Sequence, residues 1–208
     1  MSGQYFEAKP ATGSRRRTIT LVLPDLKVDL LTDRAVFSAD HIDSGTKYLL
    51  LEVPPPPSSG HVLDLGCGYG PIAVALATRA PGATVWAVDV NERAVELCAT
   101  NAATLALANV RTGLVTDDVP HGDVPEDVRF GTIWSNPPIR IGKAALHALL
   151  TTWLDRLTDD GHAYLVVQKH LGSDSLQRWL NEQGWSAERL GSRAGFRILD
   201  VSRQTPAP

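Results

Sequence analysis

Residues 61–70 have the sequence HVLDLGCGYG, and this stretch decides the fold. The apolar run at 61–65 is typical of a buried strand, and it passes directly into a glycine-rich turn. A helix is expected at about 71–80, and a second strand at 84–88 ends at Asp89. This order of elements, with an acidic residue at the end of the second strand, is typical of a nucleotide-binding site. Such a site lies at the carboxyl edge of a parallel sheet.

The spacing within the turn narrows the kind of ligand. The glycines follow a GxGxG pattern rather than the GxGxxG pattern of dinucleotide sites, which disfavours a nicotinamide-dependent oxidoreductase. Asp64, just before the turn, suits a ligand that carries an ammonium group better than one that carries a pyrophosphate. Asp89 is placed to accept hydrogen bonds from both ribose hydroxyls. The alternative is a glycine turn that binds no ligand.

The rest of the chain repeats the strand–helix alternation. The β–α units predict an α/β fold: a Rossmann-like, mostly parallel seven-stranded sheet with helices on both faces. The two last strands are expected to form an antiparallel C-terminal hairpin. Further strands are expected at 110–115, 130–135 and 163–167, helices at 91–107, 143–157 and 173–183, and the hairpin at 186–190 and 195–201.

The N-terminal quarter has a different pattern. Two β-rich runs at 18–23 and 26–31 flank Pro24-Asp25 and predict a hairpin, which residues 36–38 would extend. A helix is expected at 42–53. The run PPPPSSG at 54–60 indicates a linker, so residues 1–53 are predicted to form a small β-rich appendage on a main domain at 61–208.

A second group of residues with chemical potential follows the strand at 130–135. The sequence there is Asn136-Pro137-Pro138-Ile139. Two consecutive prolines force an extended backbone and remove two N–H donors, so the corner is rich in acceptors. The Asn136 amide oxygen and the Pro137 carbonyl suit an attacking amino group, and Ile139 offers an apolar wall for a planar ring. The alternative is a Pro-Pro turn that only ends the strand.

Composition excludes several classes of protein. The 208 residues carry a formal net charge of −3, which argues against a uniformly basic nucleic-acid coat. Basic residues nevertheless concentrate in residues 1–20 and from Asn136 onward. Neither cysteine has a partner at metal-ligand spacing, and no apolar run is long enough to span a bilayer. With no signal peptide, we expect a soluble cytoplasmic protein with no metal and no membrane partner.

Together these motifs resemble class I S-adenosylmethionine-dependent methyltransferases that act on planar nitrogen. More narrowly, the chain resembles the "methyltransferase small" group, which includes bacterial 16S ribosomal RNA guanine-N2 methyltransferases. NPPI-R-x-G-K at 136–143 is the most specific element, whereas NPP alone also occurs in glutamine-N5 and adenine-N6 methyltransferases. The segments that carry the resemblance are 36–38, 43–50, 64–72, 88–95, 135–143 and 166–169.

The resemblance implies S-adenosylmethionine as cofactor and roles for individual residues. The methionine part would lie on the glycine turn, and Asp64 would reach its amino group directly or through water. Asp89 would bind the ribose, and Asp117 or Asp118 the adenine. The implied cofactor-binding residues are Asp64, Gly66, Cys67, Gly68, Gly70, Asp89, Val90, Asp117, Asp118, Asn136 and Thr46. The implied catalytic residues are Asn136, Pro137, Pro138 and Ile139. The implied substrate-binding residues are Arg140, Lys143, Phe37 and Lys169.

The implied partner is RNA, as ribosomal RNA or the small ribosomal subunit. A protein glutamine, an adenine or a small amine remains an alternative acceptor, as does a non-catalytic cofactor- or RNA-binding assembly factor. The state of the protein as monomer or dimer is left open. A lid over the cofactor is expected from four residues near the start of a helix: Ser38, Asp43, Gly45 and Thr46. For Thr46 the alternative is a helix cap. Five basic residues are predicted to share one face around the NPPI corner: Arg15, Arg16, Arg17, Arg140 and Lys143.

Overall fold

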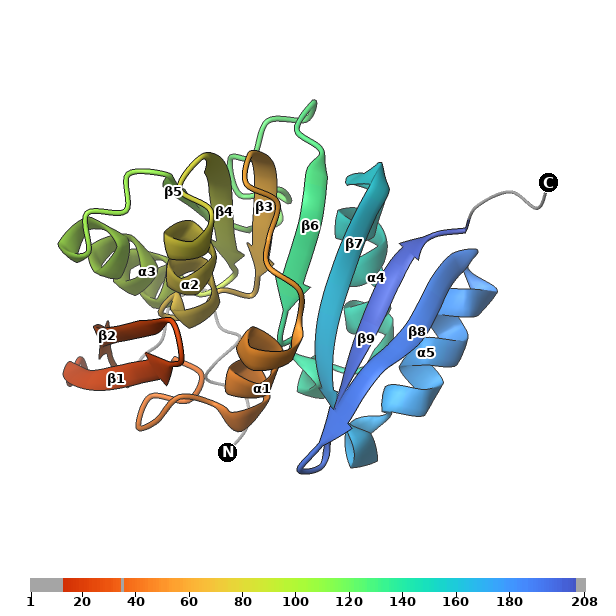
Figure 1. The fold of residues 1–208 in the computed structure, drawn as a ribbon, viewed down its shortest axis with the longest axis horizontal. Coiled ribbons are helices and arrows are strands. Elements are labelled where there is room, and N and C mark those ends of the chain that lie inside the picture. The colour runs from red at the N-terminus through yellow and green to blue at the C-terminus, as the bar shows by residue number, and fades with distance from the viewer. Residues whose placement is uncertain (1–12, 35, 205–208) are drawn as a thin grey trace.

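The computed structural model describes residues 13–34 and 36–204. Its centre is a seven-stranded sheet with the strand order β5-β4-β3-β6-β7-β9-β8 (Figure 1). The first five strands in this order run parallel, and β9, which lies between β7 and β8, runs antiparallel to both. These strands are β3 (Gly60–Leu65), β4 (Ala83–Asp89), β5 (Val110–Leu114), β6 (Phe130–Ser135), β7 (Leu157–Gln168), β8 (Trp185–Arg193) and β9 (Phe196–Arg203). The predicted α/β class, parallel sheet and antiparallel C-terminal hairpin are confirmed.

Helices cover both faces of the sheet, as predicted. Buried residues of α1, α2 and α3 share one hydrophobic cluster with one set of strand residues, including Val62 and Trp134. Buried residues of α4 and α5 share the second cluster with the alternate set, including Leu63 and Ile133. The helices are α1 (Ser44–Glu52), α2 (Pro71–Arg79), α3 (Glu92–Thr104), α4 (Lys143–Leu154) and α5 (Ser173–Glu182), with short 3-10 turns η2 (Ile139–Ile141) and η3 (Lys169–Leu171).

The N-terminal segment forms a hairpin beside the main sheet. β1 (Arg17–Leu23) and β2 (Leu26–Thr32) pair antiparallel with Leu23 opposite Leu26, which puts Pro24-Asp25 in the turn. One cluster of buried side chains runs from the hairpin through α1 into the main sheet. The proposed division at residues 54–60 stays a prediction, and residues 1–12 of the appendage lie outside the described residues.

Two expected elements differ in the structure. Residues 36–38 do not extend the hairpin: Val36 is buried, and Ser38 has a φ of 54°, a left-handed conformation that a strand does not accommodate. β7 begins at Leu157 rather than at residue 163, because Leu157 pairs with Phe130 before an irregularity in the ladder. The exposed polar residues between Leu157 and Gly161 hide this start from a hydrophobicity pattern.

The helices are shorter than predicted, and for α3 the residues at its two ends explain why. Asn91 caps α3 by accepting a hydrogen bond from the Arg93 backbone N–H, so the helix begins after it. Ala106, with a φ of 56°, ends the same helical stretch. In the part of the chain that the structure describes, no helix has the length and apolarity to cross a bilayer.

Candidate functional site

A cavity of about 280 Å³ opens at the carboxyl edge of the parallel strands. Its wall has two parts, which lie in different regions of the sequence. The part we call the glycine-loop half includes Gly66, Gly68, Asp89, Val90, Asn91 and Val115. The part we call the proline-corner half includes Phe37, Asp43, Asn136, Ile139, Gln168 and Phe196. Both predicted motifs therefore face one cavity.

The glycine loop exposes its backbone to the cavity. Gly66 and Gly68 have φ angles of 78° and 55°, which L-residues with side chains rarely adopt. A Cβ atom built on either glycine would meet no protein atom within 4 Å, so a side chain there would occupy open cavity space. The backbone N–H groups of Gly66 and Cys67 donate to the Val88 carbonyl at 2.9 and 3.0 Å, which fixes the loop against the end of β4.

Asp89 ends β4 at the centre of this half. Its carboxylate accepts hydrogen bonds from the backbone N–H of Gly68 and of Asn91, each at 2.9 Å. Burial raises the pKa of Asp89 above its ordinary value, although these hydrogen bonds oppose the shift. The carboxylate is thus held rigidly at the wall, where vicinal hydroxyl groups of a ribose would find an acceptor.

Asp64 has a structural role that its place in the motif does not reveal. Its side chain is fully buried, is not part of the cavity wall, and accepts a hydrogen bond from the Ala73 backbone N–H at the start of α2. Burial raises its pKa from 3.8 to about 8, so it is largely neutral at pH 7. Asp64 was expected to reach the ligand amino group directly or through water; its buried place behind the wall favours the second route, and the role stays a prediction.

Asn136 follows β6 at the centre of the proline-corner half. Ser135 ties this strand to the glycine loop, because its hydroxyl donates to the Leu65 carbonyl at 2.7 Å. The Asn136 side-chain amide donates to Asp43 Oδ2 at 2.8 Å and to Thr46 Oγ1 at 3.1 Å. Asp43 also caps α1, since the same oxygen accepts from the Thr46 backbone N–H at 2.9 Å. The cap of this helix is thus Asp43 and not Thr46.

The two prolines leave the corner rich in acceptors. Neither residue has an N–H, and the Pro137 carbonyl accepts from the Ile139 backbone N–H at 2.8 Å. A carbonyl oxygen has two lone pairs, so it retains capacity for one further donor. Pro137, Pro138 and Ile139 all line the cavity, with Arg140 at its exposed edge.

The structure places several of the predicted site residues outside the cavity wall. Thr46, Cys67 and Gly70 are buried behind it, and a Cβ on Gly70 would lie 2.7 Å from Cys98 Sγ. Asp117 and Asp118 are exposed beyond the wall, because Val115 bonds back to the Asp89 carbonyl and the chain then turns away. Lys143 and Lys169 are also exposed and outside the wall. Their predicted roles stay predictions.

The two cysteines are both free and buried. A hydrogen bond with Cys98 and burial raise the pKa of the Cys67 thiol well above its ordinary value, so this thiol stays protonated. Among the residues that the structure describes, no group of His, Cys, Asp or Glu side chains is arranged to hold a metal ion.

Sequence reasoning missed several residues of the wall. Gln168 ends β7 at the same sheet edge as Asp89 and Asn136, so strand position alone would have indicated it. Phe196 begins the antiparallel strand β9 and reaches the cavity from the opposite chain direction, so no motif marks it. Asp43 was expected only as part of a lid, and its bond to Asn136 had no sequence signal.

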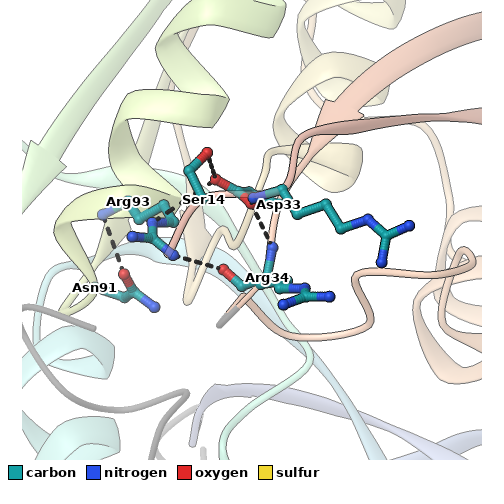
Figure 2. Close-up of polar contacts among 6 residues, drawn as sticks. Ser14, Asp33, Arg34, Asn91 and Arg93 are labelled. Atoms are coloured by element: carbon teal, nitrogen blue, oxygen red, sulfur yellow. Dashed lines mark hydrogen bonds and ion pairs between the residues drawn. The ribbon is translucent and has the colours of Figure 1, made fainter. Parts of the chain in front are cut away.

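The start of α3 is tied to the N-terminal segment (Figure 2). Asp33, which is 3% exposed, accepts hydrogen bonds from the Ser14 hydroxyl and from the backbone N–H groups of Arg15 and Arg34. Although burial opposes the shift, these bonds lower the pKa of Asp33. Arg93 donates to the Arg34 carbonyl at 3.0 Å and lies 3.9 Å from Asp33. The network braces the helix whose cap, Asn91, lines the cavity.

The donor and acceptor groups of the glycine-loop half fit S-adenosylmethionine. The side-chain-free surface at Gly66 and Gly68 has room for the methionine part, Asp89 offers the acceptor for the ribose hydroxyls, and Val90 and Val115 offer apolar surface for the adenine ring. Asp64, which was expected near the ligand amino group, and Asp117 and Asp118, which were expected at the adenine, lie outside the cavity wall, so their expected contacts stay predictions.

Known proteins resemble this chain along nearly its whole length. A 32% identical relative, YbxB of Bacillus subtilis, whose function is not assigned, matches 98% of this chain and is covered in full. The ribosomal RNA small subunit methyltransferase C of Aeromonas hydrophila is 36% identical over 178 residues, and this chain spans 49% of its length.

A solved structure also resembles this chain. The T. thermophilus 16S rRNA N2 G1207 methyltransferase RsmC, in complex with S-adenosylmethionine and guanosine, superposes with a TM-score of 0.77 and 25% identity. The match covers 94% of this chain and 52% of that one, so this chain spans about half the length of the ribosomal RNA methyltransferases that it resembles. The family model of the methyltransferase small domain matches residues 27–200, and the chain therefore belongs to this family of S-adenosylmethionine-dependent methyltransferases.

Proposed function

We propose that this protein transfers the methyl group of S-adenosylmethionine to the exocyclic N2 of a guanine in ribosomal RNA. The observation that carries the proposal is that Asp89 and Asn136 line one cavity from the ends of β4 and β6, the two strands that flank β3. One half of the cavity offers the groups for the cofactor, and the other offers acceptors for an amino group. The relatives that are named as methyltransferases of small-subunit or 16S ribosomal RNA support the choice of acceptor.

The chain's own residues would act mainly by alignment. The bound cofactor supplies an electrophilic methyl group on a sulfonium centre, so no strong protein nucleophile is needed. Asn136 Oδ1 and the Pro137 carbonyl would accept hydrogen bonds from the two N–H bonds of the acceptor amino group. These bonds hold the nitrogen lone pair toward the methyl group and stabilise the positive charge that develops on nitrogen. The proton that the product loses can pass to water.

Recognition of the RNA would fall to residues around the proline corner. Phe37 is 47% exposed at the cavity wall, where its ring can stack on an unpaired base. Arg140 lines the wall, and Lys143 and Lys169 are exposed at the start of α4 and after β7, where phosphate contacts suit them. The shared basic face that would include Arg15, Arg16 and Arg17 stays a prediction. Because the substrate is ribosomal RNA, we place the reaction in the cytoplasm.

The decisive experiment compares the modified nucleosides of ribosomal RNA from cells with and without this protein. Mass spectrometry should show one N2-methylguanine missing in the deletion strain and restored by the wild-type gene. Unchanged modification would refute the assignment to ribosomal RNA.

Purified protein with labelled cofactor then tests the other acceptors. Label in ribosomal RNA from the deletion strain supports the proposal, whereas label in a protein, in DNA or in a small amine moves the activity to another planar nitrogen. Cofactor binding by calorimetry without transfer to any of these would instead favour a non-catalytic assembly factor.

A further inference from the structure

Asp43 is a carboxylate of the N-terminal segment placed against the side chain of Asn136, 93 positions later in the chain. Its Oδ2 atom accepts from Asn136 Nδ2 at 2.8 Å and from the Thr46 backbone N–H at 2.9 Å. The second bond of the Asn136 amide nitrogen goes to Thr46 Oγ1 at 3.1 Å. Both hydrogens of the amide group are therefore engaged on the side of α1.

This arrangement fixes which way the Asn136 amide points. An ionised carboxylate only accepts hydrogen bonds, so the NH₂ group must face Asp43. The reverse orientation would place the amide oxygen against the carboxylate oxygen, with no proton between them. A charge-assisted bond to a carboxylate is also stronger than a neutral one. The amide oxygen is then the atom that Asn136 presents to a ligand.

The carboxylate is itself held in place by the start of α1. As the helix cap, Asp43 also accepts at its backbone carbonyl from the Lys47 N–H at 2.9 Å. Gly45 lets Phe196 pack directly against this turn, because a Cβ on Gly45 would lie 2.7 Å from Phe196 Cε1 and 3.0 Å from Asp43 Oδ2. Helix cap, glycine and ring together leave Asp43 little freedom to turn away from Asn136.

We infer that Asp43 is a positioning residue, which holds the Asn136 amide with its oxygen toward the acceptor and so restricts the site to acceptors that donate N–H. This inference deepens the proposed function and rests on it, because it requires that a nitrogen acceptor binds at the proline corner. A site of this kind selects exocyclic amino and amide nitrogens, which donate N–H. It disfavours ring nitrogens that carry only a lone pair, since these would face the acceptor oxygen of Asn136.

Substitutions at the two positions test this inference. Asp43→Ser keeps a good helix cap, but its shorter hydroxyl side chain can donate as well as accept, so it no longer fixes the orientation of the Asn136 amide. Asn136→Asp places two carboxylates against each other. Asp29→Ser is the matched control, because Asp29 is an exposed residue of β2 whose side chain accepts a hydrogen bond from Thr20 in the same hairpin.

Methyl transfer to ribosomal RNA from the deletion strain is the readout. We expect Asp43→Ser to lower kcat about tenfold with an unchanged KM for the cofactor, and Asn136→Asp to lower kcat at least a hundredfold. Asp29→Ser should match the wild type. A kcat for Asp43→Ser within twofold of the wild type would overturn the inference.

If the wild-type protein transfers no methyl group to this RNA, the proposed function is refuted but the inference on Asp43 is not. A second measurement then tests the inference. The side-chain amide signals of Asn136 in an NMR spectrum are identified by their loss in Asn136→Asp. We expect Asp43→Ala to speed solvent exchange of these amide protons at least fivefold. Unchanged exchange would show that Asp43 does not hold the amide.

Discussion

The two halves of the cavity are built in different ways. The glycine-loop half comes mainly from one β–α–β unit, in which β3, the loop, α2 and β4 follow one another within 30 residues. The proline-corner half brings together residues from the N-terminal segment, the end of β6, the end of β7 and the start of β9. The first half is thus a local structure, whereas the second exists only through long-range packing.

This difference has a chemical counterpart. The glycine-loop half presents backbone and one rigid carboxylate, which suits a ligand of fixed structure. The proline-corner half presents an amide, carbonyl groups and two aromatic rings, Phe37 and Phe196, from segments outside the parallel sheet. The predictions below are designed to separate the two halves.

The largest expected effect is on the proline corner. Asn136→Ala removes the amide oxygen, and we expect the rate of methyl transfer to fall by about 10² to 10³-fold, as for the loss of other preorganised polar groups. Cofactor affinity, measured by calorimetry, should change less than threefold. Equal losses of affinity and rate would show that the two halves do not act independently.

The converse variant is Gly68→Ala. It places a side chain at a φ of 55° and in open cavity space, so we expect cofactor affinity to fall about 10- to 100-fold. Gly184→Ala is the matched control, because Gly184 also has a positive φ, 85°, and open space around it but lies outside the cavity wall. If both variants bind the cofactor alike, the loop does not contact it.

The smallest expected effect concerns the support beneath the glycine loop. Because burial raises the pKa of Asp64 to about 8, the folded protein binds this proton more tightly than the unfolded chain does. The free energy of unfolding from this group therefore falls as the pH rises from about 4 to about 8. Asp64→Asn removes this dependence and can still accept from the Ala73 N–H.

Urea unfolding at several pH values checks this sign. From pH 5 to pH 8 the stability of Asp64→Asn relative to the wild type should rise by at least about 1.4 kcal/mol, the equivalent of one pKa unit. Identical pH profiles would mean that Asp64 is ionised in the folded protein, and its charge would then be available to the cofactor after all.

The contrast between the halves also explains what could be predicted from the sequence. The sheet, the hairpins and the glycine loop were predictable because each depends on neighbouring residues and on hydrophobic periodicity. Gly66, Gly68, Asp89 and Asn136 were recognisable because they belong to short motifs. Asp117 was expected at the site by its place after β5; it is exposed and outside the cavity wall, and its role stays a prediction.

Other contributions depend on packing that no local pattern encodes. Phe196 reaches the cavity because β9 runs antiparallel to β7, which brings its first residue, rather than its last, to the active edge. Burial between the layers above and below it raises the pKa of Asp64 to about 8, an effect that its neighbours in sequence do not encode. Both depend on the complete three-dimensional environment.

The bond between Asp43 and Asn136 has a consequence for the order of events during synthesis. The glycine loop and β4 leave the ribosome before the proline corner, and Phe196, which packs against Gly45, follows 60 residues after Asn136. A growing chain therefore contains the complete β–α–β unit long before its acceptor side is assembled. The cavity wall is therefore complete only when the last hairpin has docked, because Phe196 is part of that wall.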